Sequence, residues 1–138
     1  MFPPTMLAPC GLNCGLCSEA LKKENPCAGC LGDNENKPEF CSMRCKIAAC
    51  RLRKELADGF CDSCAQYPCE EMLEREHRYT TAYPMAESPM DNLRRMRCEG
   101  TEKFLASEWK KWTCGECGGV ICVHTGVCSR CGRLYHKN

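Results

Sequence analysis

Pairs of cysteines two residues apart recur along this chain and constrain its fold more than any other feature. The chain has 17 cysteines in 138 residues, above the ~8–10% that marks a short cysteine scaffold. This odd number cannot form a closed set of disulfides. The first residues, MFPPTMLAPCG, lack the basic and apolar regions of a secretory signal. We therefore expect a reduced, cytoplasmic protein in which the cysteine pairs bind metal.

Apolar packing is a weak source of stability for this sequence. Two Trp, four Tyr and four Phe are its aromatic residues, and no apolar run approaches the ~18 residues of a membrane span. Small chains with little core commonly depend on bound metal. The composition predicts a small metal-stabilised α+β fold without membrane association, in which cysteine knuckles are joined by short helices.

The most regular cysteine pattern lies in TCGECGGVICVHTGVCSRCGR, where two Cys-x2-Cys pairs are separated by ten residues. Tetrahedral zinc takes four such ligands at Zn–S distances of ~2.3 Å. Gly118 and Gly132 follow the pairs, at positions where a positive φ is often needed. The pattern predicts a zinc ribbon, a β-hairpin carrying one ion on Cys114, Cys117, Cys128 and Cys131.

A second quartet begins inside the motif CGLNCGLC. Cys14 and Cys17 are followed after nine residues by Cys27 and Cys30, which predicts another zinc site. The Cys-x3-Cys-x2-Cys spacing from Cys10 also resembles the iron–sulfur loop of radical S-adenosylmethionine enzymes. We expect that class to be excluded, because only nine residues precede Cys10 and βα repeats are absent. Cys10 is then an additional nearby thiol.

The middle of the chain has a less regular group of cysteines. Cys61 and Cys64 form a knuckle, and we assign Cys45 and Cys50 as its partners. These two converge only if a helix begins after Cys45, because five residues of continuous helix diverge by ~140°. Three cysteines remain as possible additional ligands: Cys10, Cys41 and Cys69. They could form a fourth centre with His77, or share ligands in a binuclear centre.

Helix signals divide the remaining sequence. We expect helices from Ser42 to Ala57, from Pro68 to Arg78, after the N-cap signal at Ser88, and from Thr101 to Trp112. The last carries an apolar stripe of Phe104, Leu105, Trp109 and Trp112. The predicted domains are a cysteine-rich multi-zinc domain (1–79), a proline-containing linker (80–88), and a helical segment with the zinc ribbon (89–138).

The remaining candidates have simpler interpretations. Cys98 and Cys122 are interpreted as buried small side chains. His124 is a candidate fifth ligand, although ribbon tips often carry histidine.

The motifs CGLNCGLC, CAGC, CKIAAC and CDSCAQYPCEEM, in this order, resemble a cysteine-rich family of bacterial and archaeal proteins known only as a domain of unknown function. The stretch from MDNLRRMRC to CSRCG looks like the C-terminal extension common in that family. The resemblance implies a cytoplasmic zinc-binding protein without an assigned activity. Its pattern covers Cys10, Cys14, Cys17, Cys27, Cys30, Cys45, Cys50, Cys61, Cys64 and Cys69. Cys41 lies outside the pattern, and Ala48 stands where arginine is usual.

These observations predict a non-enzymatic structural or interaction protein with at least three Zn²⁺ and a protein partner. All-thiolate sites are closed, whereas catalytic zinc keeps an open position. An iron–sulfur protein is one alternative, because four thiolates also hold such clusters; a thiol-based redox or metal-handling protein is another. Nucleic-acid binding by the ribbon is disfavoured by a formal net charge of +1, which thiolate–zinc sites make negative.

Overall fold

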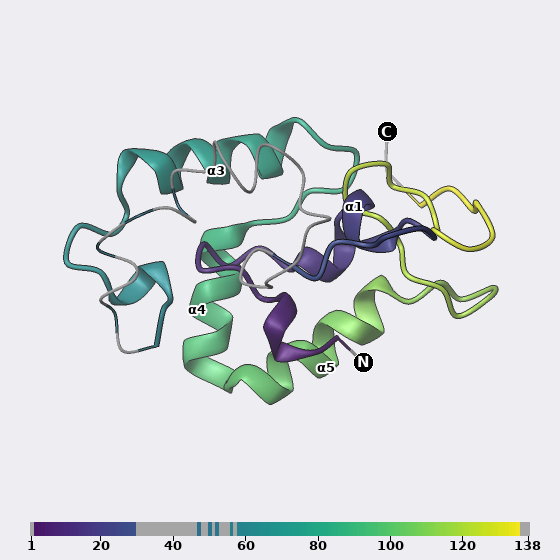
Figure 1. Ribbon diagram of the computed structural model, residues 1–138. Helices are drawn as coiled ribbons and strands as arrows, with labels where there is room; N and C mark the ends of the chain where they lie inside the picture. The colour runs from purple at the N-terminus through teal and green to yellow at the C-terminus, as the bar shows by residue number, and fades with distance from the viewer. Residues whose placement is uncertain are drawn as a thin grey trace.

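The computed structural model describes residues 2–29, 47, 50, 52, 56 and 58–135. Four α-helices carry most of the regular structure of these residues, and Figure 1 shows the N-terminal segment crossing the view between α3 and the α4–α5 pair. In chain order the elements are η1 (Pro4–Met6), η2 (Cys14–Leu16), α1 (Ser18–Leu21), η4 (Cys61–Ser63), α3 (Glu70–Thr81), α4 (Pro89–Glu99) and α5 (Thr101–Trp112). The helix predicted from Ser42 to Ala57 lies outside the described residues, apart from isolated positions.

Helix α4 begins where the sequence predicted. The Ser88 Oγ accepts a hydrogen bond from the Asp91 N–H at 2.9 Å, and Pro89 occupies the first helical position, as expected of an N-cap. Helix α3 reinforces this start, because Glu76 Oε1 accepts hydrogen bonds from the Ser88 hydroxyl at 2.8 Å and the Met90 N–H at 2.9 Å. The capping contacts therefore fix α4 against α3.

Helix α3 begins two residues later than predicted. Cys69 keeps an extended backbone as its N-cap, and Glu70 and Glu71 fill the first turn, where negative charge is favourable. Gly100 separates α4 from α5, and α4 packs against both α3 and α5.

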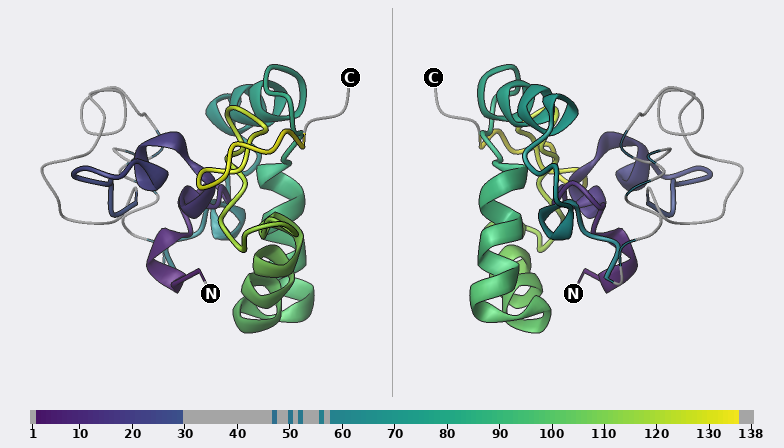
Figure 2. Two further views of the ribbon diagram at one scale, coloured as in Figure 1. Left: turned by 90° about the vertical axis from the view of Figure 1, so that its right-hand side faces the viewer. Right: turned by 90° about the vertical axis from the view of Figure 1, so that its left-hand side faces the viewer.

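One apolar core joins both ends of the described chain. Phe104, Leu105 and Trp112 from the predicted stripe of α5 are buried, and Trp109 packs edge-on against Phe2 with ring centroids 5.0 Å apart. The views in Figure 2 place the N-terminal segment beside α4 and the C-terminal loops. Further members of the same core are Leu7, Leu16, Met72, Leu93, Ile121 and Val123.

The C-terminal segment pairs through single residues. Its antiparallel bridges join Thr113 to Val120, Ile121 to Cys128, and Val127 to Leu134. These isolated bridges do not show the two-stranded hairpin that the sequence predicted, since a cysteine turn interrupts each pairing after one residue. None of the helices in the described part of the chain has the length and apolar character needed to cross a membrane.

Candidate metal centre

Four cysteine sulfurs converge in the C-terminal segment. The Sγ atoms of Cys114 and Cys131 are 3.7 Å apart, and those of Cys117 and Cys128 are 3.4 Å apart. Tetrahedral zinc with Zn–S bonds of ~2.3 Å requires Sγ–Sγ separations of ~3.8 Å. Among the described residues, this C-terminal quartet is the one group of three or more candidate ligand atoms lying within 4.8 Å of one another. Its geometry could hold one metal ion.

Two turns of the same design position the quartet. In the first, the Cys114 N–H donates to Gly119 O at 2.7 Å and the Gly118 N–H donates to Cys114 O at 2.9 Å. In the second, the Cys128 N–H donates to Arg133 O at 2.9 Å and the Gly132 N–H donates to Cys128 O at 3.1 Å. The predicted positive φ is confirmed at both glycines, with values of 75° and 81°.

Backbone amides point at the sulfurs of these turns. The N–H groups of Glu116, Gly119 and Arg130 lie 3.4 Å from the sulfurs two residues before them, on Cys114, Cys117 and Cys128 respectively. Outer hydrogen bonds of this kind orient metal ligands and stabilise their charge. The quartet is therefore arranged to carry thiolates.

The thiols of the quartet ionise unequally. The Tyr135 hydroxyl donates to Cys114 Sγ at 3.1 Å, and this bond is the main reason that the pKa of Cys114 falls to about 6. The Arg133 N–H lowers the pKa of Cys131, but burial and hydrogen bonds with the other three thiols outweigh it and raise that pKa to about 11. Because a metal binds thiolates, loading of the quartet would release the remaining protons.

The structure describes three members of the predicted N-terminal quartet, and it does not bring them together as it does the C-terminal one. The sulfurs of Cys14, Cys17 and Cys27 do not all lie within 4.8 Å of one another, although the Gly29 N–H donates to Cys27 Sγ at 3.4 Å. Cys30 lies outside the described residues, so this site stays a prediction.

The middle cysteines gather around one cavity. Cys50, Cys61, Cys64 and Cys69 line it, while Cys41 and Cys45 lie outside the described residues. Burial, together with the charges of the neighbouring thiols, raises the pKa of Cys61 to about 12; those neighbours are Cys10, Cys69, Cys50 and Cys64. His77, considered as a further ligand, is exposed on α3.

The sequence interpretation missed a third turn of the knuckle design. The Cys122 N–H donates to Val127 O at 3.0 Å and the Gly126 N–H donates to Cys122 O at 2.9 Å, as in the two quartet turns. Burial alone would raise the pKa of Cys122, but hydrogen bonds with His124 and Thr125 lower it to about 7. The shared Cys-x3-Gly spacing is the sequence signal that could have revealed this turn.

His124 connects this third turn to the N-terminal segment and to α3. Hydrogen bonds with Cys122 and Cys17 raise the pKa of His124 to about 9 against the effect of burial. Its Nδ1 lies 3.3 Å from the Ser18 backbone nitrogen, and its Nε2 lies 3.1 Å from the Tyr79 hydroxyl oxygen. Cys17 therefore lies beside His124 as well as within the predicted N-terminal quartet.

Cys98 differs from its predicted environment. It lies in α4, but its side chain is exposed, because it faces away from the buried side of the helix that carries Leu93 and Met96. Cys98 therefore is no part of the core.

The fold and the site define a small, mainly helical, cysteine-rich protein with a C-terminal group of four cysteines that could bind a metal ion. The model of a protein family of unknown function, DUF3795, matches residues 6–75, half of the chain. The chain belongs to this family, which confirms the resemblance inferred from its cysteine motifs. No curated protein and no solved structure shows significant similarity to the chain.

Proposed function

We propose that this chain is a zinc-binding structural or interaction protein without catalytic activity, and that its C-terminal segment is a zinc ribbon. The main support for this proposal is that four sulfur atoms lie within 4.8 Å of one another, those of Cys114, Cys117, Cys128 and Cys131. Four thiolates complete the tetrahedral coordination of zinc, so the site has no open position for a substrate. An ion there would hold together a segment whose backbone pairing consists of single β-bridges.

Metal binding in such modules supplies ~10–16 kcal/mol at neutral pH, which is enough to fold a chain with little core. We further propose at least three zinc ions per chain, with the others bound by cysteines of residues 1–79. The odd number of cysteines, 17, and their repeated Cys-x2-Cys spacing support a reduced, cytoplasmic location. Closed all-thiolate sites favour a protein partner over a small substrate.

The first prediction concerns metal content. Full-length protein prepared without oxygen should contain at least three zinc equivalents by elemental analysis. Cys117→Ser should remove one equivalent, because three thiolates and a hydroxyl hold zinc less tightly than four thiolates.

Cys98→Ser is the matched control, because Cys98 is exposed on α4, and it should retain every equivalent. Loss of metal in Cys98→Ser, or none in Cys117→Ser, would contradict the quartet. A brown protein containing iron and acid-labile sulfide would establish the iron–sulfur alternative.

A further inference from the structure

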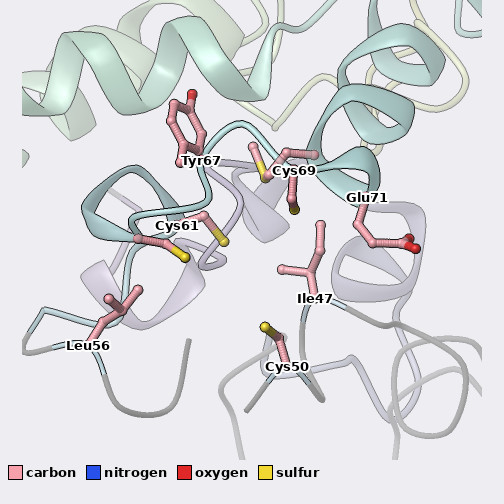
Figure 3. Close-up of a pocket in the computed structure, with 9 residues that line it drawn as sticks. Ile47, Cys50, Leu56, Cys61, Tyr67, Cys69 and Glu71 are labelled. Carbon is pink, nitrogen blue, oxygen red and sulfur yellow. The ribbon is translucent and has the colours of Figure 1, made fainter. Parts of the chain in front are cut away.

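A cavity of about 50 Å³ lies beside the start of α3, and cysteines form much of its wall. Figure 3 shows the side chains of Cys50, Cys61 and Cys69 directed toward this space, with Ile47 beside it. We call this cavity, lined by Cys50, Cys61, Cys64 and Cys69, the thiol pocket. Its remaining walls include Ile47, Leu56 and Met72, so the sulfurs face an apolar environment.

A fifth thiol reaches the same region from the N-terminal loop. The Cys61 N–H donates to Pro9 O at 2.9 Å, and this bond holds Cys10 next to the Cys61 turn. Cys10 is 2% exposed, and its charge acts on Cys61 together with those of the pocket thiols. The opening motif CGLNCGLC is thus divided, with Cys10 near Cys61 and Cys17 beside His124.

Two donors around the pocket favour negative charge on sulfur. The Gln66 N–H lies 3.4 Å from Cys64 Sγ, the same two-residue spacing and distance found in the C-terminal quartet. The guanidinium of Arg75, buried in α3 at 8% exposure, places Nη1 3.9 Å from Cys10 Sγ. Four thiolates on a divalent ion carry a net charge of −2, and a buried positive charge partly offsets the cost of burying it.

Cys50 is joined to this group less firmly. Cys61, Cys64 and Cys69 belong to one continuous segment, to which the Pro9–Cys61 hydrogen bond adds Cys10. The Cys50 N–H instead donates to Ile47 O at 3.2 Å, within its own part of the chain. The sulfurs of this group do not all lie within 4.8 Å of one another, so binding of one ion requires cysteine side chains to change rotamer.

We propose that Cys10, Cys61, Cys64 and Cys69 form a second metal centre, for a thiophilic divalent ion of the zinc class, with Arg75 as its counter-charge. This inference rests on the proposed function, since it assigns ligands to one of the further zinc sites. It replaces Cys45 and Cys50 of the sequence interpretation with Cys10 and Cys69. The centre joins the N-terminal loop to the start of α3.

The test uses full-length protein loaded anaerobically with Co²⁺ alone, whose thiolate charge-transfer absorption reports each cysteine site. Cys10→Ser and Cys69→Ser should each remove one equivalent of Co²⁺ and its share of the absorption. Cys50→Ser should retain this equivalent of Co²⁺ and its share of the absorption. Retention of all Co²⁺ by Cys10→Ser, or loss of an equivalent in Cys50→Ser alone, would overturn the assigned ligand set.

Cys117→Ser separates this inference from the proposed function. If both hold, Cys117→Ser loses one equivalent, and its combination with Cys10→Ser loses two. Loss in Cys10→Ser but not in Cys117→Ser would refute the ribbon site and leave the second centre standing. The reverse result would refute the second centre alone.

Alkylation of the unmutated protein tests the centre without relying on a variant that folds. With Zn²⁺ bound, the four ligands should react with iodoacetamide at least tenfold more slowly than exposed Cys98, and a chelator should abolish the difference. Equal protection of the four with and without the chelator would mean that burial protects them, and the assigned centre would be wrong.

Discussion

Glu87 is a buried carboxyl group that connects the N-terminal loop to helix α4. Its Oε1 accepts hydrogen bonds from the Asn92 side chain at 2.9 Å and from the Asn13 N–H at 3.4 Å. Burial raises the pKa of Glu87 to about 7, and the charge of Glu108 contributes in the same direction. The folded protein therefore holds a proton on Glu87 at pH values where the unfolded chain does not.

Because the folded protein holds this proton, we expect its free energy of unfolding to fall as the pH rises. The stabilising contribution of protonated Glu87 is complete below its unfolded pKa of about 4.5 and is lost as pH rises through about 7. Glu87→Gln removes the titrating group, so its stability relative to the unmutated protein should increase by about 2 kcal/mol between pH 5.5 and pH 8. Denaturant unfolding of zinc-loaded protein at both pH values measures this difference, in which the metal contribution cancels.

Glu99→Gln, at an exposed position of α4, provides the comparison and should show a much smaller pH-dependent difference. An equal response of the two variants would show that Glu87 ionises normally in the folded protein.

The two turns of the C-terminal quartet approach each other closely at Gly119. A Cβ at this position would lie 2.7 Å from the Cβ of Arg130, 3.1 Å from Cys128 Sγ and 3.3 Å from Cys117 Sγ. At Gly115, in the same segment, a Cβ would have no neighbour within 4 Å. Comparing alanine substitutions at Gly119 and Gly115 therefore separates crowding between the turns from the general effect of adding a methyl group.

Gly119→Ala should weaken metal binding by about tenfold or more, because overpacking costs ~1–3 kcal/mol and the displaced atoms include two candidate ligands. Gly115→Ala should bind as tightly as the unmutated protein. Competition with a chromophoric chelator measures both affinities. Identical affinities would show that the turns can separate without disturbing the site.

The molecule is held together by contacts between segments far apart in the chain. The Val123 N–H donates to Leu16 O at 3.0 Å, and the Asn92 side-chain amide donates to Gly11 O at 3.0 Å. At Gly11 the N-terminal loop meets α4 so closely that a Cβ would lie 2.2 Å from Pro89 O and 2.8 Å from Leu93 Cγ. This approach joins residues on both sides of the predicted linker, 80–88.

Gly11→Ala should therefore destabilise the protein more than Gly100→Ala. Both glycines have positive φ, at 95° and 89°, so both substitutions carry a backbone cost of ~1–3 kcal/mol. A Cβ on Gly100 meets nothing within 4 Å, whereas Gly11→Ala must also move α4, at a further ~1–3 kcal/mol. Denaturant unfolding at a fixed excess of zinc measures both, and equal losses would place the cost in the backbone alone.

The most local features of the protein were predictable from sequence. Spacing identified Cys114, Cys117, Cys128 and Cys131, because a Cys-x2-Cys turn depends on its own few residues. The start of α4 and the buried face of α5 followed from the Ser88 cap and from helical periodicity. These features depend on hydrogen bonds and side-chain directions within a few residues of one another.

Contacts between distant segments were not predictable in this way. The positions of Cys10 near Cys61 and of Cys17 beside His124 depend on how the N-terminal loop packs against neighbouring segments and the C-terminal turns. Cysteine spacing contains no information about such packing, so sequence reasoning left Cys10 open, either as an extra thiol near Cys14 and Cys17 or as a ligand of a further centre. Cys10 and Cys17 belong to one short motif, but their side chains point to different places because each follows the direction of its own backbone turn. Burial of the shared apolar core determines the position of each turn.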